Sequence, residues 1–316
     1  MPLRVAFFGT PGFAVPTLQH LIDSPHPVVG VITQPDKPRG RGQQITAGPV
    51  KALALSAGIP ILQPDRLARD QFEAAFAALD ADIGVVAAYG KILPDWLLAT
   101  PRFGLINVHA SLLPRYRGAS PVHRAVIAGD TETGVTIMRV VKALDAGPML
   151  ANVRVPIGAD DTTTIVESML AIRGAALLVQ TLDAIENGTA HEAAQDEALV
   201  SYAPKLVKSE GLIDWSIPSV RIHNLVRGLW PWPHAFTHLS GMRYIVHRSR
   251  VSPQPAGDAL AGTIVVASPI EGVHVACGHG TTLELVDVQL EGKRVMSARD
   301  LMASKALLAG ARFTAP

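Results

Sequence analysis

The chain has a single cysteine, Cys277, few aromatic residues and a formal net charge of only +1. One cysteine excludes an internal disulfide, which fits a reducing cytoplasmic compartment. No apolar run approaches the ~20 residues that a membrane-spanning helix requires. The opening residues, MPLRVAFFGTPG, reach a glycine turn within ten positions, so we expect a first β-strand there rather than a secretory signal. We therefore expect a cytoplasmic protein with no membrane partner.

Two ligand signatures are also lacking. Residues 9–12, GTPG, do not have the G-x-G-x-x-G spacing, and Gln34 rather than an acidic residue ends the second apolar run. A nicotinamide cofactor is therefore disfavoured. His274, Cys277 and His279 lie close together, but their alternating pattern resembles a strand and its turn, and a fourth ligand is not evident. We expect no metal there.

The N-terminal part alternates short apolar runs with helical patterns, and a chain of 316 residues is natural for two domains. The expected strands are residues 3–9, 28–34, 59–63, 81–90, 103–110, 134–141 and 149–157, and the expected helices are residues 14–23, 48–57, 68–79, 119–129 and 161–187. Nearly all-apolar strands separated by helices indicate a parallel sheet that is covered on both faces. The pattern predicts an α/β, Rossmann-like doubly wound domain over residues 1–188, with a mainly parallel sheet.

The pattern changes after a connector at residues 189–205. One helix near residues 217–229 is followed by short β-rich runs with turns every 8–12 residues. This favours a small β-barrel of the kind used for oligonucleotides, over residues 206–316. From Lys205 onward the chain has 12 Lys/Arg against 8 Asp/Glu. Such an excess of basic residues is compatible with binding to the phosphate backbone of a nucleic acid. A mildly basic surface that binds no partner explains it equally well.

The most informative stretch is residues 104–121, GLINVHASLLPRYRGASP. Asn107 and His109 are two residues apart in an apolar run, so in a strand both side chains point to one face. Side chains at the carboxyl ends of strands commonly form ligand sites in open α/β sheets. Asp145, in VVKALDAGP, adds a carboxylate, and the three groups together suit acyl transfer. The amide can stabilise a developing oxyanion, the imidazole can accept or donate a proton, and the carboxylate can orient the imidazole or accept a proton from the attacking group.

Each residue alone has a plainer explanation. An Asn-x-His pair on a strand is often a satisfied polar pair near a surface, and Asp145 before Ala-Gly-Pro could simply shape a turn. The combination with SLLP at residues 111–114 and the following RYRGASP is what favours a catalytic site.

Eight motifs, in order over nearly the whole chain, resemble those of the 10-formyltetrahydrofolate-dependent formyltransferases. They are FFGTPGFAVPTL, VITQPDKPRGRG, VVAAYGKILP, INVHASLLPRYRGASPVHRAV, GDTETGVTIMRV, LDAGPML, WPWP and KRVMSARDL. The likeness is to the branch of that family that acts on initiator methionyl-tRNA. It implies a Rossmann-like catalytic domain, a C-terminal OB-fold-like barrel, and transfer of a formyl group from 10-formyltetrahydrofolate to the α-amino group of methionine on that tRNA. We expect a monomer that uses no metal.

The resemblance also assigns roles to residues. It makes Asn107, His109 and Asp145 catalytic, with Asp145 either raising the basicity of His109 or accepting the amine proton directly. The implied folate-binding residues are Ala87, Ala88, Tyr89, Gly90, Lys91, Ile92, Ser111, Leu112, Leu113 and Pro114. A pterin edge is a fixed array of donors and acceptors, which backbone groups beside an apolar slot can match.

A basic loop spans residues 34–51. On the residues alone it could be an ordinary solvated loop, but in the family it contacts the acceptor end of the tRNA, and Arg41 aligns with the Arg placed there. Gln43 and Gln44 stand where a pair of Lys often sits, so phosphate attraction from the loop should be weaker. The other tRNA-binding candidates are Lys37, Arg39, Lys205, Lys208 and Arg248.

Other functions remain open. A folate-dependent formyltransferase that acts on a small amine, such as a nucleotide or an amino sugar, would keep the same three residues but has little need for the basic loop or the barrel. Folate deformylation by water would use the same set. A non-catalytic RNA-binding protein would have no use for an Asn-His-Asp arrangement.

Overall fold

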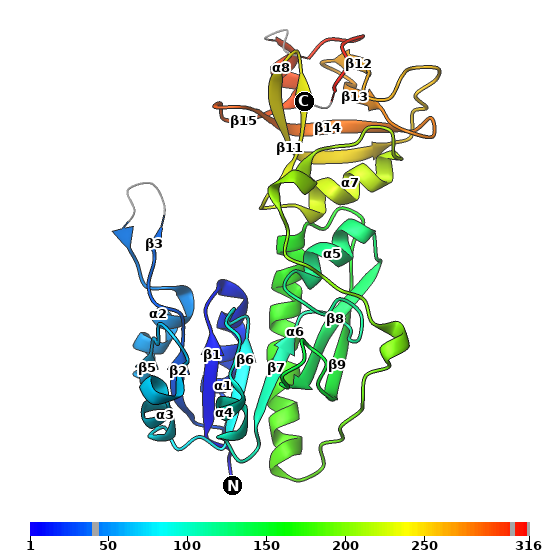
Figure 1. The fold of residues 1–316 in the computed structure, drawn as a ribbon. Helices are drawn as coiled ribbons and strands as arrows, with labels where there is room; N and C mark the ends of the chain where they lie inside the picture. Colours follow the sequence, from blue (N-terminus) through cyan, green and yellow to red (C-terminus); the bar gives the residue numbers. More distant parts are fainter. Residues whose placement is uncertain (40–43, 304–306, 315–316) are drawn as a thin grey trace. The chain divides into compact units, whose positions relative to one another are not determined.

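The computed structural model describes residues 1–39, 44–303 and 307–314. It divides into two compact units (Figure 1). The N-terminal unit comprises Met1–Gly118, Glu132–Pro156 and Glu167–Ala203, and the C-terminal unit comprises Ala119–Thr131, Ile157–Val166 and Pro204–Pro316. The units therefore interleave along the chain, whereas the sequence suggested consecutive domains, because residues 119–131 and 157–166 cluster with the C-terminal unit.

The N-terminal unit contains a seven-stranded sheet in the order β5-β2-β1-β6-β7-β8-β9. Its strands are β1 (Val5–Gly9), β2 (Val28–Ile32), β5 (Ile61–Leu62), β6 (Ile83–Ala87), β7 (Leu105–His109), β8 (Glu132–Arg139) and β9 (Met149–Pro156). The strands from β5 to β7 are parallel, which confirms the expected mainly parallel α/β sheet.

The last two strands differ from the expected parallel arrangement. Strand β8 runs antiparallel to β7, and β9 runs antiparallel to β8. The connection from β8 to β9 spans residues 140–148. That is too short for the crossover helix that a parallel pair requires, so the two strands form a hairpin.

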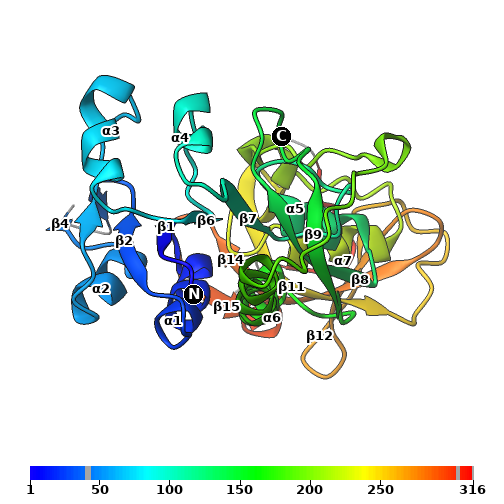
Figure 2. The same cartoon turned by 90° about the horizontal axis from the view of Figure 1, so that it is seen from below.

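Helices cover both faces of this sheet. They are α1 (Val15–Ile22), α2 (Pro49–Ser56), α3 (Arg69–Ala77), α4 (Asp95–Ala99) and α6 (Thr163–Glu186), with a 3-10 turn η1 (Gly12–Ala14) and a short hairpin of β3 (Pro38–Arg39) and β4 (Gln44–Ile45). Helices α1 and α6 lie on one face and α3 and α4 on the other (Figure 2). The doubly wound layering predicted from the sequence is confirmed.

The two faces decide where the β7 side chains point. A Cβ on Gly174 of α6 would lie 3.0 Å from the Val108 side chain, so Val108 faces α6. Leu105 packs on the opposite face, in the cluster formed with Phe72 and other residues of α3 and α4. Because strand side chains alternate, Asn107 and His109 share the face of Leu105.

Helix α6 is long and apolar enough to cross a membrane by length and composition alone, with a mean hydropathy of 1.5 over its most apolar window. Its apolar residues do not form one uninterrupted run, because Glu167, Arg173 and Asp183 lie within the helix. Its buried positions recur every three or four residues along one side, at Thr163, Val166, Leu170, Ala171, Gly174, Ala175, Leu178, Thr181, Leu182 and Ile185. That periodicity is typical of a helix packed against a core.

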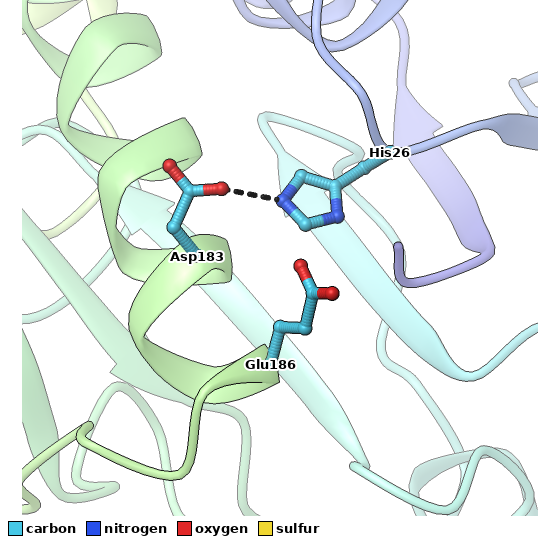
Figure 3. A group of neighbouring side chains, drawn as sticks. All are labelled: His26, Asp183 and Glu186. Carbon is cyan, nitrogen blue, oxygen red and sulfur yellow. Dashed lines mark hydrogen bonds and ion pairs between the residues drawn. The ribbon is translucent and has the colours of Figure 1, made fainter. Parts of the chain in front are cut away.

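A polar group ties α6 to the start of the sheet (Figure 3). His26 is fully buried; its Nδ1 accepts from the Leu3 amide at 3.0 Å and its Nε2 donates to Asp183 at 3.1 Å. Ligand atoms of His26, Asp183 and Glu186 lie within 4.8 Å of one another, close enough for a metal. Because both imidazole nitrogens are already engaged, we assign this group a structural role.

The C-terminal unit contains a six-stranded antiparallel sheet in the order β10-β11-β14-β13-β12, with β15 on β14. Its elements are α5 (Pro121–Ala128), η3 (Lys208–Gly211), α7 (Ser219–Gly228), β10 (Ala235–Leu239), β11 (Met242–Ser252), β12 (Ile264–Ser268), β13 (Gly272–Ala276), β14 (Thr282–Leu290), β15 (Val295–Ser297) and α8 (Ala298–Ala303). The sequence predicts a β-rich second domain with a helix near residues 217–229, and the antiparallel sheet and helix α7 confirm it.

The chain's last described residues join the two edges of this sheet. Ile264 of β12 donates to the Ala311 carbonyl at 2.8 Å, and Thr314 donates to the carbonyl of His238 in β10 at 2.9 Å. Between them, Phe313 stacks on Trp215 at 5.5 Å between ring centroids. The barrel-like closure is thus completed by this tail rather than by direct pairing of β10 with β12.

Candidate active site

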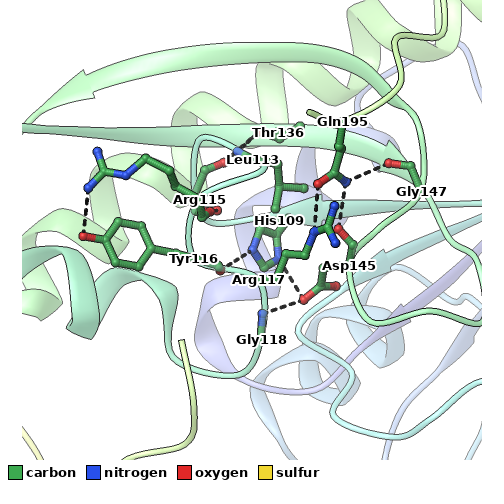
Figure 4. A network of polar contacts seen from close by, with 11 residues as sticks. His109, Leu113, Arg115, Tyr116, Arg117, Gly118, Thr136, Asp145, Gly147 and Gln195 are labelled. Carbon is green, nitrogen blue, oxygen red and sulfur yellow. Dashed lines mark hydrogen bonds and ion pairs between the residues drawn. The ribbon is translucent and has the colours of Figure 1, made fainter. Parts of the chain in front are cut away.

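Strand β7 carries two of the three expected catalytic residues at its carboxyl end. His109 is 5% exposed, and its Nε2 donates to the Tyr116 carbonyl at 3.1 Å. Its Nδ1 lies 3.7 Å from Oδ2 of Asp145 (Figure 4). Asn107 is half-buried, and its side-chain amide has no hydrogen bond to any residue that the structure describes. The structure therefore brings His109 and Asp145 together and leaves a free amide beside them on the same strand face.

Asp145 sits in a strained turn. Its φ is +46°, in the left-handed region that side chains rarely adopt. Its Oδ2 accepts from the Gly118 amide at 2.8 Å. At Gly147 a Cβ would lie 1.9 Å from the Arg139 carbonyl oxygen, so only glycine fits there. Asp145 shapes a turn, as one sequence interpretation held, and its carboxylate also reaches His109.

The SLLP segment after β7 is rigid and internally bonded. The Ser111 hydroxyl donates to the Arg115 carbonyl at 2.7 Å, and Ser111 is fully buried. Thr136 of β8 donates to the Ser111 carbonyl at 2.8 Å and accepts from the Leu113 amide at 3.1 Å. The peptide between Leu113 and Pro114 is cis. The segment is thus positioned as a fixed wall rather than a set of free side-chain donors.

Leu112 completes this wall on the other side. A Cβ on Gly134 of β8 would lie 2.4 Å from its side chain, so the glycine makes room for Leu112 to lie against the strand.

The second expected folate-binding segment, residues 87–92, follows β6. Ala88 and Gly90 have φ of +48° and +76°, which turns the backbone sharply at the strand end. The Tyr89 ring points into the core, 5.6 Å edge-on from Phe8, and burial raises the pKa of Tyr89 to about 12. The Tyr89 carbonyl accepts from Nε2 of Gln34 at 2.7 Å. The Tyr89 side chain is therefore an anchor in the core, so at this residue only the backbone can face a ligand.

Two other residues of the segment point away from the core. The Lys91 ammonium donates to the carbonyls of Pro64 and Asp65 at 2.7 and 2.8 Å, and burial lowers the pKa of Lys91. Ile92 is 95% exposed. A large apolar side chain left in water is a candidate ligand contact.

The expected tRNA-binding residues are described only in part. Arg41 and Gln43 lie outside the described residues, as do the side chains of Arg39 and Gln44. Lys37, Lys205 and Lys208 are exposed. Arg248 is also exposed, but its guanidinium pairs with Asp287 at 3.1 Å.

Sequence reasoning missed Arg117 and Gln195. Arg117 is 4% exposed and donates through Nε to Oε1 of Gln195 at 3.0 Å. The Gln195 amide donates in turn to the carbonyls of Asp145 and Gly147, both at 2.8 Å. Arg117 lies within the quoted RYRGASP motif, but nothing in a single sequence marks an arginine as buried.

A doubly wound α/β domain thus presents an amide, an imidazole and a carboxylate near the carboxyl ends of its strands, and these are groups that acyl transfer uses. The formyl transferase family model matches residues 3–182, and the model of the formyl transferase C-terminal domain matches residues 205–306. The chain belongs to the formyl transferase family, and it is a formyl-transferring enzyme.

Its curated relatives share its full length. The methionyl-tRNA formyltransferase of Methylococcus capsulatus is 46% identical over 98% of this chain and 99% of its own. That of Thiobacillus denitrificans is 45% identical over 99% of this chain and 100% of its own.

Solved structures show the same fold at low identity. An N-formyltransferase from Helicobacter canadensis, in complex with folinic acid and dTDP-3-aminofucose, has a TM-score of 0.67 at 17% identity, covering 89% of this chain and 98% of its own. HypX from Aquifex aeolicus, in complex with tetrahydrofolic acid, has a TM-score of 0.63 at 11% identity, covering 96% of this chain and 47% of its own.

Proposed function

We propose that this enzyme transfers the formyl group of 10-formyltetrahydrofolate to the α-amino group of methionine on initiator methionyl-tRNA. The observation that carries the proposal is the full-length likeness, at 43–46% identity, to proteins named methionyl-tRNA formyltransferase. The match to the C-terminal domain model over residues 205–306 supports it further. We also propose that it acts as a monomer. A cytoplasmic location is proposed as well, since a single cysteine fits a reducing compartment.

The neutral amine of methionine attacks the formyl carbon, and the bond from that carbon to the folate nitrogen then breaks. The departing nitrogen takes up one proton in place of the one that the amine loses, so the products are the formylated amine and tetrahydrofolate. Asn107 donates to the formyl oxygen as negative charge develops there. Its support for this role is a half-buried amide with no competing hydrogen bond among the described residues.

His109 and Asp145 handle the proton of the attacking amine. The Nε2 of His109 already donates to Tyr116, so a proton that arrives at the imidazole is held at Nδ1. There it faces Oδ2 of Asp145, 3.7 Å away, whose charge stabilises the imidazolium. This supports a shared role, in which His109 takes the proton and Asp145 favours the charged form.

The folate donor binds along residues 87–92 and 111–114. The rigid, internally bonded SLLP segment supports this role because a fixed wall costs little to organise on binding. The exposed side chain of Ile92 supplies apolar surface that a ligand can cover.

The tRNA acceptor end contacts the basic loop at residues 34–51 through Lys37, Arg39 and Arg41, and the phosphate backbone contacts Lys205, Lys208 and Arg248. Support comes from the exposure of Lys37, Lys205 and Lys208 and from the excess of basic residues after Lys205. The ion pair of Arg248 with Asp287 lowers the contribution that we expect from Arg248 to tRNA binding.

The test offers the enzyme 10-formyltetrahydrofolate with charged initiator tRNA, charged elongator tRNA, free methionine or a nucleotide-linked amino sugar. Formylation of the charged initiator tRNA in strong preference to the other acceptors is expected. Equal use of free methionine or of the amino sugar would replace the tRNA assignment by a small-amine formyltransferase. Release of formate without any acceptor at the same rate would indicate folate deformylation.

A further inference from the structure

The segment from residue 189 to residue 203 does more than connect two parts of the chain. Gln195 is 9% exposed, and Ser201 and Ala203 are hydrogen-bonded to the backbone of Arg117. A spacer has only to cover a distance, and its polar side chains are expected to lie in water. The buried contacts of this segment therefore require an explanation.

Arg117 fixes the orientation of the Gln195 amide. A guanidinium has only donors, so the Gln195 oxygen must face Arg117 Nε, at 3.0 Å. The NH₂ group then points to the opposite side, where its two hydrogens reach the carbonyls of Asp145 and Gly147, both at 2.8 Å. Glu197 holds the far end of the guanidinium at 2.7 Å. Figure 4 shows this chain of contacts from Arg117 to the Asp145 turn.

Gln195 thus ties both ends of the three-residue turn that begins at Asp145. The turn has a left-handed φ of +46° at Asp145, a conformation that persists only when its surroundings impose it. With the backbone fixed by Gln195 and Oδ2 fixed by the Gly118 amide, the carboxylate has one position relative to His109.

The same segment also holds the other partner of the imidazole. The Ser201 hydroxyl accepts from the Tyr116 amide at 3.0 Å, and the Ser201 carbonyl accepts from the Arg117 amide at 2.9 Å. The Tyr116 carbonyl that receives His109 Nε2 is therefore positioned by residues 201–203. Both nitrogens of His109 face groups that this segment places.

We propose that Gln195 and Arg117 are positioning residues, which set the distance and direction between Asp145 and His109 without touching substrate. This rests on the proposed function, since it assigns them to the proton-handling pair. A small displacement of a reacting group can cost about 100-fold in rate, so the pair needs such support.

The test uses Gln195→Glu in the full-length chain. The variant keeps the side-chain shape and the contact with Arg117 but cannot donate to the two carbonyls. We expect kcat to fall by about 10- to 100-fold, with KM for both substrates unchanged within about twofold and the pH profile of kcat displaced. Arg117→Lys, which loses the fork geometry of the guanidinium, should act in the same direction.

The matched control is Glu192→Gln, in the same segment. Glu192 pairs with Arg139 at 2.7 Å and makes no hydrogen bond to residues 145–147 of the described chain. Because Gln keeps the shape of Glu and can still accept from Arg139, kcat should not change.

A double-mutant cycle separates positioning from general destabilisation. Once Asp145→Asn has removed the carboxylate, Gln195→Glu should cost less than about threefold more, because the two changes act through one unit. An equal loss in both backgrounds would overturn the proposal.

A second measurement does not depend on the reaction. The ¹⁵N signals of the His109 ring should shift in Gln195→Glu and stay in place in Glu192→Gln. An unchanged His109 signal in Gln195→Glu would overturn the positioning role. A wild-type enzyme that formylates no tRNA would overturn the proposed function instead, and the ¹⁵N measurement would still decide the role of Gln195.

Discussion

His109 Nδ1 lies 3.7 Å from Asp145 Oδ2, and each residue holds a second partner on one short segment: Tyr116 for the imidazole and Gly118 for the carboxylate. His109 ends strand β7, and Asp145 lies in the loop between β8 and β9, 36 positions further along the sequence. Residues 116–118 therefore act as a common reference for both. The relative position of the two side chains therefore depends on the backbone of residues 116–118 as well as on β7 and on the Asp145 turn.

Replacing Asp145 by Asn should abolish most activity while preserving the fold. The amide oxygen can still accept from Gly118, but the negative charge that stabilises a proton on His109 is lost. We expect kcat to fall by about 10²- to 10⁴-fold with little change in KM. Steady-state kinetics with initiator methionyl-tRNA measure this, and the melting temperature checks folding. Turnover near the wild-type rate would remove Asp145 from the mechanism.

Replacing Asn107 by Ala should lower kcat by about 10²- to 10³-fold, the usual cost of one oxyanion donor. Because the side chain has no hydrogen bond among the described residues, stability should change little. Asn152→Ala, an exposed change on β9 of the same sheet, is the control and should keep full activity. Comparable kcat values for the two variants would contradict the role of Asn107.

The position of the reacting side chains could be predicted because strand geometry is local. Once residues 103–110 are identified as a strand, alternation alone puts Asn107 and His109 on one face, opposite Val108. The helix and strand ranges follow from the same kind of periodicity. The observed β7, for example, spans Leu105–His109.

The rest depended on contacts between distant residues. The antiparallel pairing of β8 with β9 follows from the short loop at residues 140–148, but the antiparallel pairing of β8 with β7 crosses a connection that contains α5, and the strand pattern does not predict it. The burial of Arg117 and the role of Gln195 depend on a contact between residues that lie 78 positions apart in the sequence. Tyr89 looks like a surface aromatic in a loop, and only its packing on Phe8 makes it a core residue.

Cys277 should be inert in the folded protein. The thiol is 3% exposed, and burial raises the pKa of Cys277 to about 12, so little thiolate forms at neutral pH. A colorimetric disulfide reagent at pH 8 should label it only as fast as the C-terminal unit unfolds, and at once in denaturant. Rapid labelling of the native enzyme would contradict the burial of this side chain.

The double variant Lys205→Ala, Lys208→Ala should bind tRNA more weakly, and its binding should depend less on salt concentration. Both side chains are exposed, and neither has an ion pair among the described residues. Each phosphate contact contributes about 0.7 to 0.9 to the slope of log K against log salt, so the slope should fall by about 1.5. Lys142→Ala is the control, because Lys142 is equally exposed but pairs with Asp95 at 3.0 Å. An unchanged slope in the double variant would show that the tRNA backbone does not contact these two lysines.

The C-terminal unit should lose stability as the pH falls below about 6.5, the ordinary pKa of histidine. Burial lowers the pKa of His223, whose Nε2 donates to the Ala159 carbonyl at 3.0 Å. Burial also lowers the pKa of His234, with smaller contributions from the charges of His247 and Arg243. The unfolded chain therefore takes up protons in a pH range where the folded chain does not, and each such proton favours unfolding.

Urea unfolding followed by tryptophan fluorescence measures this effect, since three of the four tryptophans, Trp215, Trp230 and Trp232, lie in that unit. The midpoint should be constant from pH 8 to pH 7 and fall between pH 6.5 and pH 5. In His223→Gln combined with His234→Gln, the fall should be smaller, because two groups that bind protons more readily in the unfolded state are gone. A midpoint that falls as steeply in the double variant as in the wild type would show that other groups cause the acid sensitivity.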